Sequence, residues 1–276
     1  MANARNMKIG VFDSGLGGLF IFKSLIKKLP QYDYLYLGDV KHLPYGNRSN
    51  FVIYEFTKNA VDYLFRRNCG LVILACNTAS AAALRKIQQE YLPRCYPRRK
   101  ILGVIVPTLE ETLAVRTGKI GVLATSATVN SGVFREELEK ISPRLKIYQE
   151  AAPLLVPLIE NGNLKEAETI LAAHLRNLLK RKVGAIVLGC THYPILKTAA
   201  RRIAGRAKII SQDEFLSAKL ADYLSRYSEI EKNLSLGRGR VFLVTDLTPH
   251  FQKTAEKWFG RKINLKLVNL ASRRCG

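Results

Sequence analysis

The chain has 276 residues, of which 47% are hydrophobic, so it can bury the core of one large domain or of two smaller ones. No apolar run reaches the roughly eighteen residues of a membrane-spanning helix, and a strand-like segment follows a short polar start. These features indicate a soluble cytoplasmic protein without a membrane partner. The 44 Lys and Arg against 22 Asp and Glu give a formal net charge of +22, which attracts anions and polyanions.

Apolar, β-branched runs alternate along the chain with amphipathic helical segments. Strands are predicted at 7–12, 34–37, 71–75, 101–106, 120–124, 145–149, 185–188, 208–210 and 241–245. Helices are predicted at 19–28, 50–67, 79–91, 131–141, 164–182, 196–203 and 214–226. This alternation predicts an α/β fold with mainly parallel sheets.

An internal repeat suggests that the chain consists of two similar halves. The tetrapeptide Lys-Ile-Gly-Val occurs at 8–11 and again at 119–122. At a similar distance after each copy, a Val-, Ile- and Leu-rich run ends in a cysteine, Cys76 in the first half and Cys190 in the second. The Pro- and Arg-rich stretch 93–100 is the predicted crossing between the halves.

The two matched cysteines carry the chemistry that this pattern favours. Reactive groups in parallel sheets gather where strands end, so two facing halves would each direct one thiol into a shared cleft. A thiolate accepts a proton and a thiol donates one, so opposed thiols suit a proton that leaves one face of a carbon and returns on the other. A single cysteine is more often a small buried hydrophobe, and we interpret Cys69, Cys95 and Cys275 as structural.

Two polar positions accompany these cysteines. Asp13 opens the loop Asp-Ser-Gly-Leu-Gly-Gly between a predicted strand and a helix, where it either hydrogen-bonds a strand-end thiol or caps the helix. The glycines allow a tight turn whose amides could hold a carboxylate or phosphate, but their spacing is not that of a dinucleotide site. His192 lies two residues beyond Cys190, where it either assists that thiol or is a turn residue. The four histidines lack the spacing of a zinc site, so no metal is predicted.

Four segments, in order along nearly the whole chain, resemble the glutamate racemases of the aspartate/glutamate racemase family. They are residues 13–18 (DSGLGG), 44–46 (PYG), 75–80 (ACNTAS) and 189–194 (GCTHYP), with supporting matches at 121–125 and 156–160. The residues around both cysteines favour glutamate over aspartate racemases. Two places depart from the family pattern: Val106, where relatives often carry Glu, and Ile210-Ser211, where Asp-Ser is common.

The resemblance implies a cofactor-independent racemase that interconverts L- and D-glutamate and supplies D-glutamate for peptidoglycan synthesis. It implies two similar α/β domains related by a pseudo-twofold axis, residues 1–100 with 212–276 and residues 101–211, with the active site in the cleft between them. Cys76 and Cys190 would be the paired acid and base, supported by Asp13 and His192 respectively. The matching substrate-binding positions are Asp13, Ser14, Tyr45, Gly46, Asn77, Thr78, Thr191 and His192. The family also suggests a homodimer, and Asp39 and Glu160 are candidates for supporting roles behind these residues.

Two alternative functions stay open. A racemase or isomerase of another small carboxylate would keep the cleft and change Ser14, Tyr45 or Thr78, and none of these is changed. A nucleic-acid-binding protein would depend on the positive charge, but the basic runs are dispersed and no zinc-finger spacing or long basic tail accompanies them. Some racemases of this family are linked to DNA gyrase inhibition, and no motif here supports a contact with gyrase or nucleic acid.

Overall fold

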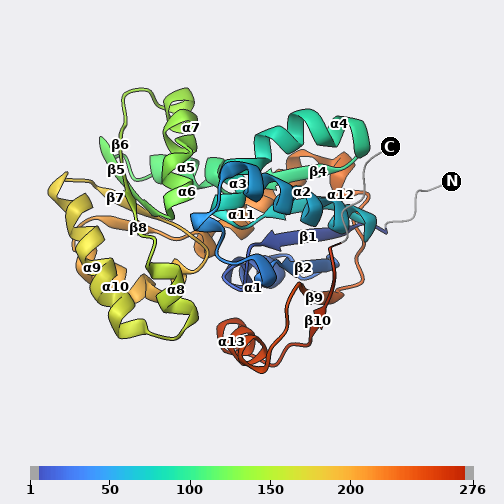
Figure 1. Ribbon diagram of the computed structural model, residues 1–276. Helices are drawn as coiled ribbons and strands as arrows, with labels where there is room; N and C mark the ends of the chain where they lie inside the picture. The colour runs from blue at the N-terminus through green and yellow to red at the C-terminus, as the bar shows by residue number, and fades with distance from the viewer. Residues whose placement is uncertain (1–5, 271–276) are drawn as a thin grey trace.

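Two parallel β-sheets flanked by helices make up the computed structural model, which describes residues 6–270 (Figure 1). The strands of the first sheet are, in spatial order, β10 (Leu265–Leu267), β9 (Arg240–Val244), β2 (Tyr34–Gly38), β1 (Lys8–Asp13), β3 (Cys69–Leu74) and β4 (Lys100–Gly103). Those of the second sheet are β6 (Lys146–Ala151), β5 (Lys119–Ala124), β7 (Ala185–Gly189) and β8 (Lys208–Ile210). All of these strand pairs are parallel, which confirms the predicted fold class.

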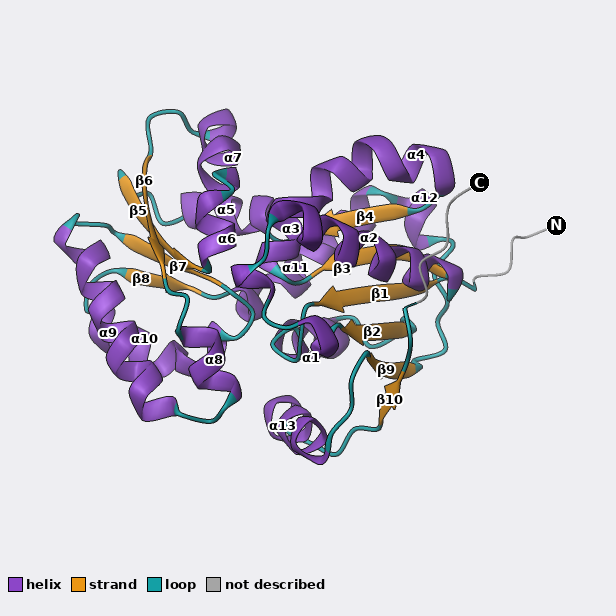
Figure 2. Cartoon of the chain, in the orientation of Figure 1, coloured by secondary structure: helices purple, strands orange, loops and turns teal. Residues whose placement is uncertain are grey.

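The two sheets repeat one strand order. In the first sheet the neighbours run β2, β1, β3, β4, and in the second they run β6, β5, β7, β8. The repeated Lys-Ile-Gly-Val starts the second strand of each series, β1 or β5, and each cysteine follows the third, β3 or β7. The arrowhead of β1 points toward the second sheet in Figure 2. The repeat in the sequence therefore corresponds to a repeated topology.

Helices cover both faces of both sheets. On the first sheet α2 (Asn50–Arg66) and α3 (Asn77–Lys86) pack on one face, and α1 (Leu19–Lys28), α11 (Gln212–Arg226) and α13 (Pro249–Phe259) on the other. On the second sheet one face carries α8 (Leu155–Glu160), α9 (Leu164–Lys180) and α10 (Lys197–Ala204), and the other α5 (Ile105–Leu113) and α7 (Val133–Ile141). The shorter helices are α4 (Leu92–Cys95), α6 (Ser126–Asn130) and α12 (Ser228–Glu231).

One apolar core is shared by the two sheets. Ile9 and Val11 of β1 and Ile120 and Val122 of β5 belong to the same buried cluster, together with residues of α1, α5, α7 and α11. Strands buried on both faces explain the near-continuous apolar runs of the sequence. Because one core spans both sheets, the loops at their carboxyl ends are held against each other.

Some elements differ from the sequence-based prediction. The strand predicted at 101–106 is wrong beyond Gly103, because α5 begins at Ile105 and Pro107 lies in its first turn, where no backbone N–H is needed. A short apolar run does not distinguish a buried strand from a buried helix. Helices α4, α6, α8, α12 and α13 and strand β10 were not predicted. β4 pairs with β3, so the first sheet continues across the predicted division at residue 100.

Parts of the prediction fall outside the described residues. They are residues 1–5 and 271–276, which form the two ends of the predicted first domain. Cys275 is one of these residues. Among residues 6–270, no helix is both long enough and apolar enough to cross a bilayer.

We expect Phe22→Ala to lower the free energy of unfolding by about 3–5 kcal/mol, because it leaves a cavity in a fully buried aromatic cluster. The Phe22 ring lies 5.4 Å from that of Tyr36 and 5.3 Å from that of Phe242. Urea unfolding measures the change. Phe51→Ala is the control, since Phe51 is 72% exposed and its loss should cost less than about 0.5 kcal/mol. Equal losses in the two variants would contradict the assigned core.

Candidate active site

Cys76 is held between the end of β3 and the start of α3. Its Sγ accepts a hydrogen bond from the Ala79 N–H (3.4 Å) and lies 3.3 Å from Ser14 Oγ. Burial raises the pKa of Cys76 to about 12, and the charge of Asp13 adds to this rise, while the contacts with Ser14 and Ala79 oppose it. A helix N-terminus favours a thiolate, but here the cost of burial is larger. Near neutral pH Cys76 is therefore a protonated thiol, able to donate a proton.

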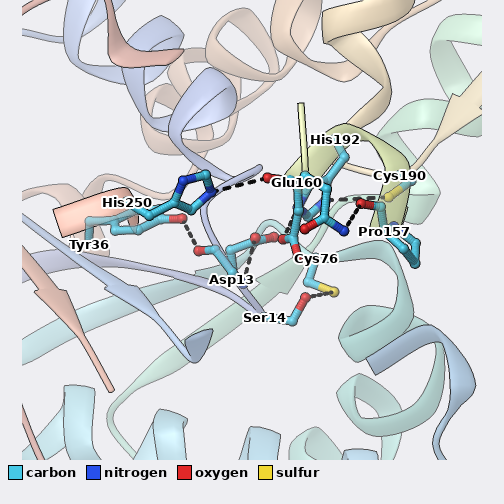
Figure 3. A network of polar contacts seen from close by, with 11 residues as sticks. Asp13, Ser14, Tyr36, Cys76, Pro157, Glu160, Cys190, His192 and His250 are labelled. Carbon is cyan, nitrogen blue, oxygen red and sulfur yellow. Dashed lines mark hydrogen bonds and ion pairs between the residues drawn. The ribbon is translucent and has the colours of Figure 1, made fainter. Parts of the chain in front are cut away.

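Cys190 follows β7 and has different surroundings. His192 Nδ1 lies 3.8 Å from Cys190 Sγ, and His192 Nε2 lies 2.8 Å from Glu160 Oε1 (Figure 3). Burial lowers the pKa of His192, but the hydrogen bonds and charges of Cys190 and Glu160 outweigh it and raise this pKa well above its ordinary value. The imidazole therefore lies between the Cys190 sulfur and the Glu160 carboxylate. The two thiols thus have different surroundings, since a hydroxyl and a backbone N–H contact Cys76.

Asp13 ends β1 and is fully buried. Its Oδ2 accepts a hydrogen bond from the Gly15 N–H (3.0 Å), while Oδ1 is buried without a hydrogen-bond partner among residues 6–270. Burial raises the pKa of Asp13, and the charge of His192 and the N–H of Gly18 oppose the rise. Asp13 acts on Cys76 through its charge, and the side-chain contact to that thiol comes from Ser14. The predicted alternative of a helix cap is not seen, since α1 starts without a side-chain cap.

Gly17 allows the loop after β1 to approach the loop of the second cysteine. A Cβ at position 17 would lie 2.7 Å from Thr191 Oγ1 and 2.8 Å from His192 Nδ1, distances that carbon atoms do not tolerate. A side chain here would displace His192. Glycine is therefore required at position 17 because no side chain fits there, and not because of its backbone dihedral freedom.

A small cavity of about 20 Å³ lies between the two cysteine loops. The predicted residues that line it are Ser14, Tyr45, Gly46, Cys76, Asn77, Thr78, Cys190, Thr191 and His192. Asp13 lies behind Ser14 and is the one predicted site residue that does not line it. The lining residues that the sequence analysis did not select are Leu43, Pro44, Asn47, Thr125, Pro153 and Val156.

Threonine hydroxyls join the two halves beside this cavity. Thr78 Oγ1 of α3 lies 2.9 Å from Thr125 Oγ1 and 3.1 Å from Thr128 Oγ1, and all three side chains are buried. Thr125 was missed, although the internal repeat could have identified it. Counted from Lys-Ile-Gly-Val, Thr125 occupies the position that Ser14 occupies in the first half.

Buried polar groups behind the cavity fix its walls. Asn77 exchanges two side-chain hydrogen bonds with Gln212 (2.8 and 2.9 Å), and Gln212 Nε2 also donates to Thr108 Oγ1. These contacts connect the first residue of α3 with α11 and α5. Gln212 carried no signal in the sequence, because its role depends on residues far away in the chain.

Asp39, a predicted supporting residue, holds Tyr45 on the other side of the cavity. The Tyr45 hydroxyl donates to Asp39 Oδ2 (2.5 Å) and the Thr245 hydroxyl donates to Asp39 Oδ1 (2.7 Å). His42 Nδ1 lies 2.9 Å from the same carboxylate. Asp39 is fully buried and so fixes the tyrosine rather than facing the cavity.

Helix α13, which was not predicted from the sequence, supports the His192 side of the site. The Trp258 ring meets the His192 ring edge-on, with centroids 5.6 Å apart, and stacks on Phe20. His250 Nε2 lies 3.3 Å from the Glu160 carbonyl oxygen (Figure 3). α13 thus restrains both His192 and the segment that carries Glu160.

Comparisons with known proteins agree with this geometry. Residues 27–214 match the family described as Asp/Glu/Hydantoin racemase. A glutamate racemase of Persephonella marina is 37% identical over 273 residues, covering 96% of this chain and 98% of that protein. Two solved structures are similar to this chain, and in each the alignment is 30% identical and covers 96% of this chain and 98% of the other chain. One is a glutamate racemase isoform of Bacillus anthracis, with a TM-score of 0.87. The other is the Francisella tularensis glutamate racemase in complex with D-glutamate, with a TM-score of 0.86.

Two parallel-sheet halves that enclose a pair of buried thiols define the class of this protein as an isomerase of the racemase type. The chain belongs to the Asp/Glu/Hydantoin racemase family, as its family match and its full-length relatives show. The comparisons support racemisation of glutamate as its activity.

We expect Glu160→Gln to lower the pKa of His192, because the variant removes a negative charge that stabilises the imidazolium while keeping an acceptor of the same shape. The imidazole would then lose its proton at a lower pH than in the parent protein. An NMR titration of the His192 ring signals measures this directly.

Glu150→Gln is the matched control for this titration. Glu150 Oε1 lies 2.9 Å from His174 Nδ1, so the chain offers a second Glu–His pair whose histidine is not among the residues that line the cavity. This variant should leave the His192 titration unchanged. An unchanged His192 pKa in Glu160→Gln would contradict the assigned contact.

Proposed function

We propose that this protein interconverts L- and D-glutamate by a two-base mechanism, with Cys76 and Cys190 as the paired acid and base. One observation carries the proposal: two buried thiols from equivalent loops line the same cavity, one beside a hydroxyl and the other beside an imidazole whose pKa is raised. In one direction the Cys190 thiolate removes the α-proton, and the Cys76 thiol donates a proton to the opposite face. In the other direction the two cysteines exchange roles.

The difficulty of the reaction lies in the weak acidity of the α-proton. Positioned acid and base groups contribute about 10²- to 10⁴-fold, so the developing carbanion needs electrostatic stabilisation as well. The N-terminus of α3 supplies backbone N–H groups at Asn77 and Thr78, next to Cys76, and a helix N-terminus attracts a carboxylate. We assign these amides to the α-carboxylate, whose oxygens share the developing charge.

The remaining polar residues of the cavity are assigned to substrate binding. Ser14, Tyr45, Gly46, Thr191 and His192 line it, and together with Asn77 and Thr78 they offer hydroxyl, amide and backbone groups to the second carboxylate and the ammonium. Asp13 completes this set from behind Ser14, where its buried carboxylate does not line the cavity. The Francisella tularensis relative was solved with D-glutamate, which supports this choice of ligand.

A cavity of about 20 Å³ has room for about one water molecule, so a substrate with two carboxylates requires the walls to separate. The predicted domains, residues 1–100 with 212–276 and residues 101–211, would be the bodies that move, with β4 (Lys100–Gly103) remaining in the first sheet. The repeated strand order supports their relation by a pseudo-twofold axis. The contact of Thr78 with Thr125 would open in this motion.

Three further parts of the sequence-based prediction are proposals of the same kind. They are a homodimer, a cytoplasmic location and a role in supplying D-glutamate for peptidoglycan. The homodimer is tested by light scattering of the purified protein, and a monomer at all concentrations would remove it.

The reaction itself is tested by incubating the purified protein, without added cofactor, in D₂O with L-glutamate, D-glutamate or L-aspartate. We expect loss of optical activity for both glutamate enantiomers and the gain of one α-deuterium by mass spectrometry, with L-aspartate unchanged. Turnover of L-aspartate alone would favour the alternative of another small carboxylate.

We expect Cys76→Ala and Cys190→Ala each to reduce racemisation by at least about 10²-fold, because each removes one of the two proton-transfer groups. Circular dichroism checks that the variants are folded. Cys69→Ala is the control, since Cys69 is a buried free cysteine of β3 that does not line the cavity, and it should keep its activity. A folded, fully active Cys76→Ala or Cys190→Ala variant would exclude the two-base assignment.

A further inference from the structure

Basic residues from three distant parts of the chain meet at the amino edge of the first sheet. We call this group the basic edge, and it consists of Lys8, Arg66, Arg67, Arg94, Arg98, Arg99 and Lys100. Lys8 starts β1 opposite Cys69, and its Nζ lies 3.5 Å from the Arg67 carbonyl oxygen. Lys100 starts β4 opposite Leu71. Parallel strands bring their starting residues to one edge, and so the fold gathers runs that are dispersed in the sequence.

Several of these cations are held in place by neutral groups. Arg99 donates to the Cys69 carbonyl oxygen (2.9 Å) and to Asn68 Oδ1 (3.2 Å). Arg67 donates to the Tyr63 hydroxyl (2.8 Å), and its guanidinium lies over the same ring. A neutral acceptor orients a guanidinium without cancelling its charge.

Carboxylates compensate little of this charge. Arg66 pairs with Asp62, whose carboxylate also accepts hydrogen bonds from Tyr91 and Tyr96. Within residues 6–270, none of the other six cations of the basic edge forms an ion pair. Five of the seven side chains are exposed: Arg66, Arg67, Arg94, Arg98 and Lys100. The basic edge is therefore a dense, accessible and largely uncompensated positive surface.

We propose that the basic edge binds the phosphate backbone of a nucleic acid. Oriented guanidinium groups match phosphate oxygens in pairs, and an array of them matches a chain of phosphates. Attachment to a bilayer surface would need exposed apolar side chains to insert beside the charges. The large apolar side chains that are exposed among residues 6–270 lie outside the runs that form the basic edge. These features favour nucleic acid as the partner.

The basic edge lies at the opposite end of the strands from the cavity. Cys76 follows the carboxyl end of β3, whereas the basic edge surrounds its amino end, near α4 in Figure 1. A nucleic acid bound there leaves the thiols accessible. Binding and racemisation are therefore separable by mutation.

Fluorescence anisotropy with a labelled DNA duplex of about 20 base pairs tests the proposal over a range of salt concentrations. The variant is Arg94→Gln/Arg98→Gln/Lys100→Gln, which removes three exposed charges and none of the hydrogen bonds described above. The control is Lys180→Gln/Arg181→Gln/Lys182→Gln, an exposed run at the end of α9 with the same change in net charge.

We expect the basic-edge variant to bind more than tenfold more weakly and to lower the slope of log affinity against log salt by about 3, or about 0.9 for each lost phosphate contact. The control should change the affinity less than twofold, and both variants should keep the racemisation rate. Equal weakening in the two variants would show attraction by net charge alone and overturn the proposal. It would also be overturned by an absence of binding at low salt, or by tighter binding to vesicles of anionic phospholipid than to DNA.

Discussion

The active site depends on the burial of a charged imidazole between two acidic groups. His192 is 2% exposed and lies between the thiol of Cys190 and the carboxylate of Glu160. An unpaired charge in this position would cost several kcal/mol, so both neighbours are required if the imidazole is to keep its proton. The two thiols consequently differ although their loops are equivalent: Cys190 faces a cation, whereas Cys76 faces a hydroxyl and the negative charge of Asp13.

The fold provides this arrangement through its repeated topology. Equivalent strands, β3 and β7, deliver the two cysteines, and β1 and β5 are followed by Ser14 and Thr125, which line the same cavity. The shared apolar core, the Thr78–Thr125 contact and the Gln212–Thr108 hydrogen bond then hold the halves together. α13 adds Trp258 against His192, and so a helix near the end of the chain supports the middle of the site.

The sequence alone predicted those helices, strands and loops that depend on the pattern of neighbouring residues. Helix 19–28 and strand 208–210 have the predicted bounds, and each cysteine loop follows a strand as expected. The run at 101–106 was wrong beyond Gly103, because apolar residues suit a buried helix and a buried strand equally. Gln212, Trp258 and the basic edge could not be predicted, since each acquires its role from neighbours distant in the sequence. Thr125 was predictable from the repeat but was not selected.

The unequal thiols have a consequence for the state in which each turnover leaves the protein. In the proposed mechanism, one reaction in the forward direction moves a proton onto Cys190 and leaves Cys76 as a thiolate, which its burial and the charge of Asp13 disfavour. The released enzyme is then a high-energy tautomer of the resting one. The protonation states of Cys76 and Cys190 therefore depend on which enantiomer was made last. They return to those of the resting enzyme only by proton exchange with solvent or by reaction with the opposite enantiomer.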